Sequence, residues 1–171
     1  MSVMGENHLI LTCDNYNRLI RLTLQHNDLQ KAELTFEHMK RRQVLPNSVT
    51  FNQLLAANLR AGKMKRVDEL LEEMKSLNIH NNSVTRALLI EHATSYQQLT
   101  SLLGKLKQHQ RTEPILIAAS RAALRVNQPS LAFSFLNQPQ VSPVFTYKLI
   151  ETCAQMQLTD PTLNVWHRLK A

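Results

Sequence analysis

The sequence predicts an all-α protein, a right-handed α-solenoid of about five helix–turn–helix hairpins. Two observations support this prediction: the composition is helix-favouring, and the first part of the chain repeats with a fixed period of 35 residues. Leu, Gln, Ala and Lys are abundant, whereas the aromatic residues that favour strands make up only 5% of the chain. The 171 residues are enough for a stack of about five such units.

The repeat is visible without any gap when residues 13–47 are aligned with residues 48–82. Identical residues recur at the pairs Asn17/Asn52, Leu19/Leu54, Leu24/Leu59, Glu37/Glu72, Met39/Met74, Lys40/Lys75 and Asn47/Asn82. The four residues from Asn47 to Thr50 also recur from Asn82 to Thr85. Identity at one fixed period, together with matched apolar positions, indicates a structural repeat.

Each unit is predicted to contain two helices joined by a tight turn. In the first unit we expect helices at about 15–26 and 28–41, separated by Asn27. The residue 35 positions later is Gly62, and both residue types tolerate the left-handed conformation that ends a helix. One hairpin cannot bury its own apolar stripes, so neighbouring hairpins must stack. The residues expected to be buried in this way are Leu19, Phe36, Leu54 and Leu71.

After residue 85 the pattern is looser, and the predicted boundaries are approximate. Residues 1–12 form an N-terminal extension, and the predicted repeat domain covers residues 13–171. Its units are about 13–47, 48–82, 83–113, 114–142 and 143–171. Within the third unit we expect a second helix from about Tyr96 to Gln108, and within the fourth a turn at Asn127.

Residues 48–82 closely resemble a pentatricopeptide repeat. The resemblance rests on the segments Ser48–Leu55, Arg60–Gly62 and Leu71–Lys75, and residues 13–47 are similar. The tetratricopeptide family also forms helical hairpins. Its period is one residue shorter, however, and its Trp…Leu-Gly…Tyr pattern does not occur here.

The resemblance implies binding of single-stranded RNA, with one base recognised per repeat by two or three side chains. The implied base-recognition pairs are Asn17 with Asn47 and Asn52 with Asn82. An asparagine amide both donates and accepts hydrogen bonds, and in this family asparagine at both places favours pyrimidines. Asn17 and Asn52 could instead cap helices, but they lie a few residues inside the predicted helix starts.

Other residues are implied to hold the RNA on either side of each base. Val49 and Val84 match the apolar residues that flank a base, and Arg60 matches a basic residue that faces the phosphate. In the third unit Ala87 replaces the recognition asparagine. Residues 83–171 instead carry nine Lys/Arg against four Asp/Glu, most of the net charge of +7. The expected phosphate contacts there are Arg86, Lys105, Lys107, Arg111, Arg121 and Arg125.

The sequence contains no motif for catalysis, metal or cofactor binding. Its two cysteines are far apart, and no histidine pair has zinc-binding spacing. The acidic residues Asp68, Glu69, Glu72 and Glu73 lie near Lys65, Arg66 and Lys75, which favours ion pairs over an acid/base site. No apolar run is long enough to span a membrane. We therefore expect no enzyme, no cofactor, no membrane and no small-molecule substrate.

Two functions from different classes remain possible. The first is a non-catalytic RNA-binding subunit of an organellar ribonucleoprotein such as the mitochondrial ribosome. The second is a scaffold that contacts only protein in a large organellar complex. The resemblance implies a mitochondrion or, alternatively, a plastid, although residues 1–12 resemble neither a secretory signal nor an Arg-rich transit peptide. Apolar residues near both ends, at Leu9–Leu11 and at Val165, Trp166 and Leu169, favour a bound subunit over a free-standing protein.

Overall fold

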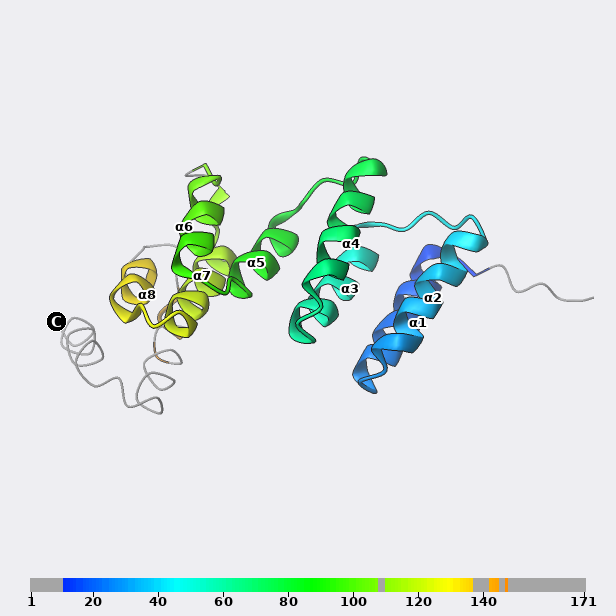
Figure 1. Cartoon of the computed structure of the whole chain (residues 1–171), viewed down its shortest axis with the longest axis horizontal. Coiled ribbons are helices and arrows are strands. Elements are labelled where there is room, and N and C mark those ends of the chain that lie inside the picture. The colour runs from blue at the N-terminus through cyan, green and yellow to red at the C-terminus, as the bar shows by residue number, and fades with distance from the viewer. Residues whose placement is uncertain (1–10, 108–109, 137–141, 145–146, 148–171) are drawn as a thin grey trace, which may run out of the picture. The chain divides into compact units, whose positions relative to one another are not determined.

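The computed structural model describes residues 11–107, 110–136, 142–144 and 147. These residues form eight helices and no strand (Figure 1). The helices are α1 (Cys13–Gln25), α2 (Leu29–Arg41), α3 (Ser48–Arg60), α4 (Met64–Ser76), α5 (Ser83–Glu91), α6 (Tyr96–Gly104), α7 (Glu113–Arg125) and α8 (Pro129–Leu136). They divide into two compact units, unit 1 (Met1–His80) and unit 2 (Asn81–Ala171). The predicted all-α fold of helical hairpins is confirmed.

Unit 1 contains two hairpins, α1–α2 and α3–α4, and α3 packs against both helices of the first hairpin (Figure 1). The turns within the hairpins contain Asn27 (φ 58°) and Gly62 (φ 69°) in the left-handed region, as the sequence predicts. After α2 and α4, Gln43 (φ 57°) and Asn78 (φ 56°) take the same conformation. Both pairs of turn residues are 35 positions apart, so the backbone itself repeats with the period of the sequence.

The repeated segment that begins with Asn47 and Asn82 starts a helix in both places. Oδ1 of Asn47 accepts hydrogen bonds from the backbone amides of Val49 (3.0 Å) and Thr50 (3.1 Å) at the start of α3. Oδ1 of Asn82 accepts from the backbone amide of Thr85 (2.9 Å) at the start of α5. Each bond satisfies amide groups that have no partner inside the helix, so part of the sequence identity reflects helix capping.

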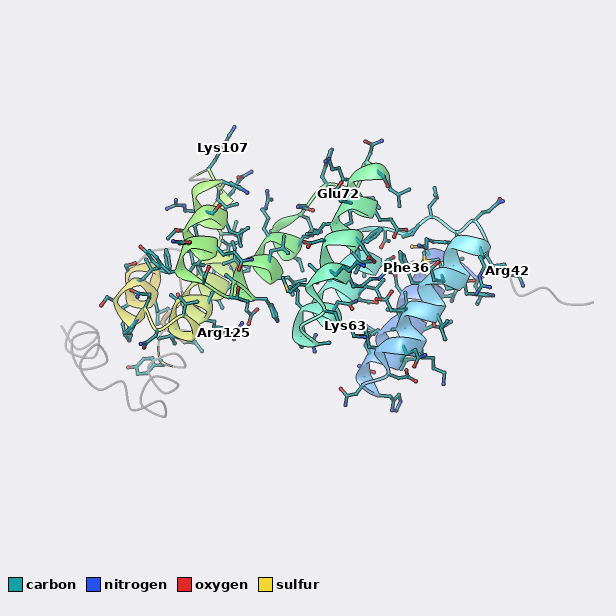
Figure 2. The ribbon with its side chains drawn as sticks, viewed as in Figure 1. Phe36, Arg42, Lys63, Glu72, Lys107 and Arg125 are labelled. Carbon is teal, nitrogen blue, oxygen red and sulfur yellow. The ribbon has the colours of Figure 1, made fainter. Side chains whose placement is uncertain are left out.

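The core of unit 1 joins the two hairpins through aromatic and aliphatic side chains. Phe36 of α2, labelled in Figure 2, meets Phe51 of α3 edge to face, with ring centroids 5.5 Å apart. Both rings are fully buried, as is Leu54. The predicted burial of Phe36 and Leu54 is confirmed.

The predictions for Leu19 and Leu71 are wrong. Leu19 is 40% exposed and Leu71 is half-buried, although each occupies the position of a buried residue in the other repeat. Leu54 lies on α3, which packs on the first hairpin, whereas no described hairpin precedes α1. Phe36, at the position equivalent to Leu71, is buried against Phe51 of the following hairpin. Leu70, the neighbour of Leu71, is buried instead.

Unit 2 is organised around α7, which packs against α5, α6 and α8 (Figure 1). This helix is rich in buried alanines, which allow its neighbours to approach closely: Ala118, Ala119, Ala122 and Ala123. Asn127 takes φ 56° between α7 and α8, confirming the predicted turn of the fourth unit. The helix α6 ends at Gly104, four residues before the predicted end at Gln108. Most of the predicted fifth unit, 143–171, lies outside the described residues, as do Leu9, Ile10 and Trp166.

Candidate nucleic-acid interface

Asn17 lies on the fifth residue of α1, where its side chain is almost fully buried. Its Oδ1 accepts a hydrogen bond from the hydroxyl of Thr50 (2.7 Å), and its Nδ2 donates to Oδ1 of Asn47 (3.3 Å). The structure thus brings the first predicted recognition pair, Asn17 and Asn47, into direct contact. Both ends of the Asn17 amide are engaged inside the protein.

Asn47 is the exposed member of this pair. Its Oδ1 is shared among Asn17, the two helix-start amides and the hydroxyl of Thr50 (3.2 Å). Its Nδ2 donates no hydrogen bond within the described part of the chain. An amide NH₂ group carries two protons, so Asn47 offers donors to acceptor atoms on a base edge.

The second predicted pair, Asn52 and Asn82, has one member in each unit. Asn52 is half-buried on the fifth residue of α3, equivalent to Asn17 on α1, and does not cap the helix. Asn82 is half-buried at the start of α5, and its Oδ1 also accepts from the hydroxyl of Thr85 (3.0 Å). The predicted recognition asparagines therefore occupy equivalent positions in successive repeats.

The two valines predicted to flank bases are exposed. Val49 is 49% exposed and Val84 is 53% exposed, each on the second residue of its helix and two residues after a capping asparagine. An apolar side chain held in water at the same place in two repeats leaves apolar surface that a stacked base would cover. Asp14, which occupies the equivalent place on α1, is exposed too.

The predicted phosphate contacts differ in how they are engaged within the protein. Arg60 is exposed at the end of α3, where its Nε donates to the carbonyl oxygen of Ala56 (3.2 Å). Arg121 pairs with the carboxylate of Glu91 (3.2 Å), and Arg125 donates to the backbone carbonyl of Glu91 (2.6 Å). These two contacts hold α7 against the end of α5, so Arg121 and Arg125 have a structural role.

Three other predicted phosphate contacts, Arg86, Lys105 and Lys107, line one hollow in unit 2. The residues come from α5 and from the segment that follows α6. Arg111 is half-buried and is not part of this lining. The sequence predicts each of these cations as a separate phosphate contact, because the charge pattern alone does not show which of them line the same hollow.

Acidic residues of unit 1 form ion pairs, as predicted for Glu69, Glu72 and Glu73. Their partners are Arg66 (3.1 Å), Lys75 (3.6 Å) and Lys40 (2.9 Å), respectively. Burial alone would lower the pKa of Lys40, but hydrogen bonds with Glu37 and Glu73 raise it above its usual value. Glu73 therefore joins α4 to α2, whereas the ion pairs of Glu69 and Glu72 lie within α4.

Sequence reasoning missed a polar network centred on Glu33 of α2. Its carboxylate accepts from Nη2 of Arg66 (2.7 Å) and from Nδ2 of the buried Asn58 (2.7 Å). The hydrogen bond to Glu33 raises the pKa of Arg66, so this arginine stays charged. The network ties α2 to both helices of the second hairpin.

Two overlapping stretches of the chain, residues 14–60 and 46–92, match the PPR repeat family. Residues 14–92 form a short array of PPR repeats. The matches cover α1 to α5, which include both predicted recognition pairs and both exposed valines. PPR repeat proteins are in general non-catalytic helical binders of RNA. No curated protein matches the chain significantly.

The described residues contain no group of three or more His, Cys, Asp or Glu side chains that could hold a metal ion. Of the described helices, none is long and apolar enough to cross a membrane.

Proposed function

We propose that this PPR protein is a non-catalytic RNA-binding and assembly subunit of an organellar ribonucleoprotein, such as the mitochondrial ribosome. It contacts single-stranded RNA through the starts of α3 and α5, with a preference for pyrimidines, and binds other protein subunits. The proposed location is the mitochondrion, with the plastid as the alternative.

The observation that carries this proposal is the repeated arrangement of a capping asparagine followed by an exposed valine. Asn47 with Val49, and Asn82 with Val84, begin successive first helices of the PPR-matched region. In each case an amide that can recognise a base edge is two residues from an apolar side chain that can cover the base face. Asn17 stabilises the first of these sites, because its Nδ2 donates a hydrogen bond to Oδ1 of Asn47.

The proposed RNA contact at the starts of α3 and α5 is tested by photo-crosslinking the full chain to single-stranded RNA that contains 4-thiouridine, followed by peptide mapping. Crosslinks are expected in the segments 47–52 and 82–87, and substitution of both Val49 and Val84 by serine should reduce them strongly. Arg18, exposed on α1, provides an Arg18→Gln control that should leave the crosslinks unchanged. Crosslinks confined to other segments would contradict the proposed contact.

A protein-binding scaffold without RNA contact is the second candidate. It is favoured by exposed leucines in unit 1, because Leu22, Leu34 and Leu45 are 49%, 58% and 77% exposed. The same crosslinking experiment separates the two functions, since a scaffold would give no RNA crosslink in either predicted segment.

A further inference from the structure

The hollow in unit 2 between α5 and the end of α6 is built from residues of both helices and of the segment after α6. Its volume is about 520 Å³, within the range of about 300–1,000 Å³ typical of small-ligand sites. The base-recognition asparagines and the exposed valines do not line it. The hollow therefore shares the start of α5, at Arg86, with the RNA contacts proposed above, but not their asparagines and valines.

Among the described residues, the lining of this hollow contains three cations, Arg86, Lys105 and Lys107, and no acidic residue. None of the three forms an ion pair within the described part of the chain, whereas Lys40, Arg66 and Arg121 all do. Clustered like charges repel one another, so the arrangement is unfavourable until an anion joins it. The lining thus has the charge of an anion site.

Arg86 gives the most specific indication of a ligand. It lies in the first turn of α5, where the helix dipole disfavours a cation, and this turn contains no acidic residue. Its Nε is buried and has no hydrogen-bond partner among the described residues. A buried donor without a partner is costly, so the guanidinium of Arg86 is not fully engaged by the described part of the protein.

Lys107 is joined to Gln110 by two hydrogen bonds. Oε1 of Gln110 accepts from the backbone amide of Lys107 (3.1 Å), and the amide of Gln110 donates to the carbonyl of Lys107 (2.9 Å). Lys105 directly follows α6, and Figure 2 shows the side chain of Lys107 extending away from this helix. The backbone of Lys107 is thus held by its bonds to Gln110, and that of Lys105 by the end of α6.

The remaining lining is mostly apolar and suits the flat part of a nucleotide. Leu89, Ile90, Leu102 and Leu106 supply aliphatic side chains, and the amide of Asn81 adds a polar group. Aliphatic walls beside cations can hold a base or sugar next to a phosphate. A phosphomonoester carries a charge of about −1.5 to −2 at neutral pH, more than the single charge of an internal phosphodiester, and so matches three unpaired cations better.

We propose that this hollow binds the terminal phosphate of a nucleotide, carried either by a free nucleoside monophosphate or by the 5′ end of an RNA strand. Arg86, Lys105 and Lys107 contact the phosphate, and the aliphatic wall contacts the nucleoside. The hollow acts as a binding site, since none of the described residues that line it offers a carboxylate or histidine for chemistry. For the RNA source, the inference rests on the proposed function.

The first test uses calorimetric titration of the full chain with uridine 5′-monophosphate, uridine and inorganic phosphate. The monophosphate should bind at least about tenfold more tightly than uridine, because its phosphate adds charge-assisted hydrogen bonds that uridine cannot form. Equal binding of the monophosphate and uridine, or no binding of either, would overturn the proposal. This comparison uses the unaltered protein and does not depend on the folding of any variant.

A matched pair of variants then locates the site. Lys107→Gln, at an exposed position, should weaken monophosphate binding by about tenfold, and Lys107→Arg should retain it. Lys65→Gln removes one charge from an exposed site on α4 in unit 1 and should leave binding unchanged. Equal losses in Lys107→Gln and Lys65→Gln would show diffuse charge attraction and overturn the assignment.

The source of the phosphate is distinguished with two RNA strands of one sequence, one ending in a 5′-phosphate and one in a 5′-hydroxyl. A preference for the phosphorylated strand that Lys107→Gln removes assigns the hollow to RNA ends. Equal affinities, together with monophosphate binding, assign it to a free nucleotide. If neither strand binds, the proposed RNA function fails. The monophosphate titration still tests whether the hollow binds a nucleotide.

Discussion

The hydroxyl of Thr50 donates a hydrogen bond of 2.7 Å to Oδ1 of Asn17, joining the first helix of one repeat to the first helix of the next. Thr50 is fully buried and Asn17 nearly so. The residue predicted to recognise a base is therefore part of the packing between repeats. It acts on the candidate interface by holding Asn47, the exposed member of the pair.

Replacing Asn17 by Ala should lower the free energy of unfolding by about 1–3 kcal/mol, because buried polar groups lose their partners. Thr50→Val removes the other side of the same hydrogen bond. In urea denaturation followed by circular dichroism, the losses of the two single variants should sum to more than that of the double variant. Additive losses would show that the bond contributes nothing of its own.

Leu54→Ala should lower the free energy of unfolding by about 2–5 kcal/mol, since this side chain is fully buried. Leu19→Ala, at the equivalent position of the first repeat, should cost less than about 1 kcal/mol because the side chain is 40% exposed. The same denaturation measurement compares the two. Equal losses would contradict the exposure of Leu19.

The ion pair between Glu33 and Arg66 should be worth more than the exposed pair between Glu72 and Lys75. The side chains are 23% and 26% exposed in the first pair, but 76% and 79% in the second. Double-mutant cycles with glutamine should give about 1–2 kcal/mol for Glu33–Arg66. The Glu72–Lys75 cycle should give less than about 0.5 kcal/mol. Similar coupling energies would contradict a role for Glu33 in joining the hairpins.

Asn52→Ala and Arg60→Ala should affect RNA binding in different ways. The first should shift the preference among bases, since an amide that recognises a base edge is lost. The second should weaken binding to all sequences alike and lower the salt slope by about 0.7, the value for one phosphate contact of a single strand. Titration of the four homopolymeric strands at several salt concentrations measures both effects. An equal loss of affinity for all four strands in Asn52→Ala would contradict a recognition role for Asn52.

The helical hairpins were predictable because period and turn residues are local properties of the sequence. Asn27 and Gly62 mark their turns by residue type, and the structure gives both a positive φ. Gln43 and Asn78 show that the connections between hairpins repeat as well. The positive φ of Gln43 was not predictable from its residue type, because glutamine rarely adopts this conformation.

Burial and pairing were less predictable because they depend on neighbouring repeats. Leu19 and Leu54 share a residue type and a repeat position, yet only Leu54 has a preceding hairpin to cover it. The family resemblance predicts a recognition role for Asn47, but neither its capping of α3 nor its contact with Asn17 follows from that resemblance. The hollow beside Arg86 arises from two short helices and the turn that follows them, which no periodic pattern specifies.

The central claim, that this PPR array binds single-stranded RNA, is tested most directly by fluorescence anisotropy titration of the full chain with a labelled pyrimidine-rich RNA across a salt series. The account predicts saturable binding at low salt and a linear fall of log affinity with log salt, because phosphate neutralisation supplies much of the affinity. It also predicts weaker binding of the same sequence in a duplex, whose bases are not accessible for stacking. Absence of binding at the lowest salt, or equal affinity for strand and duplex, would contradict it.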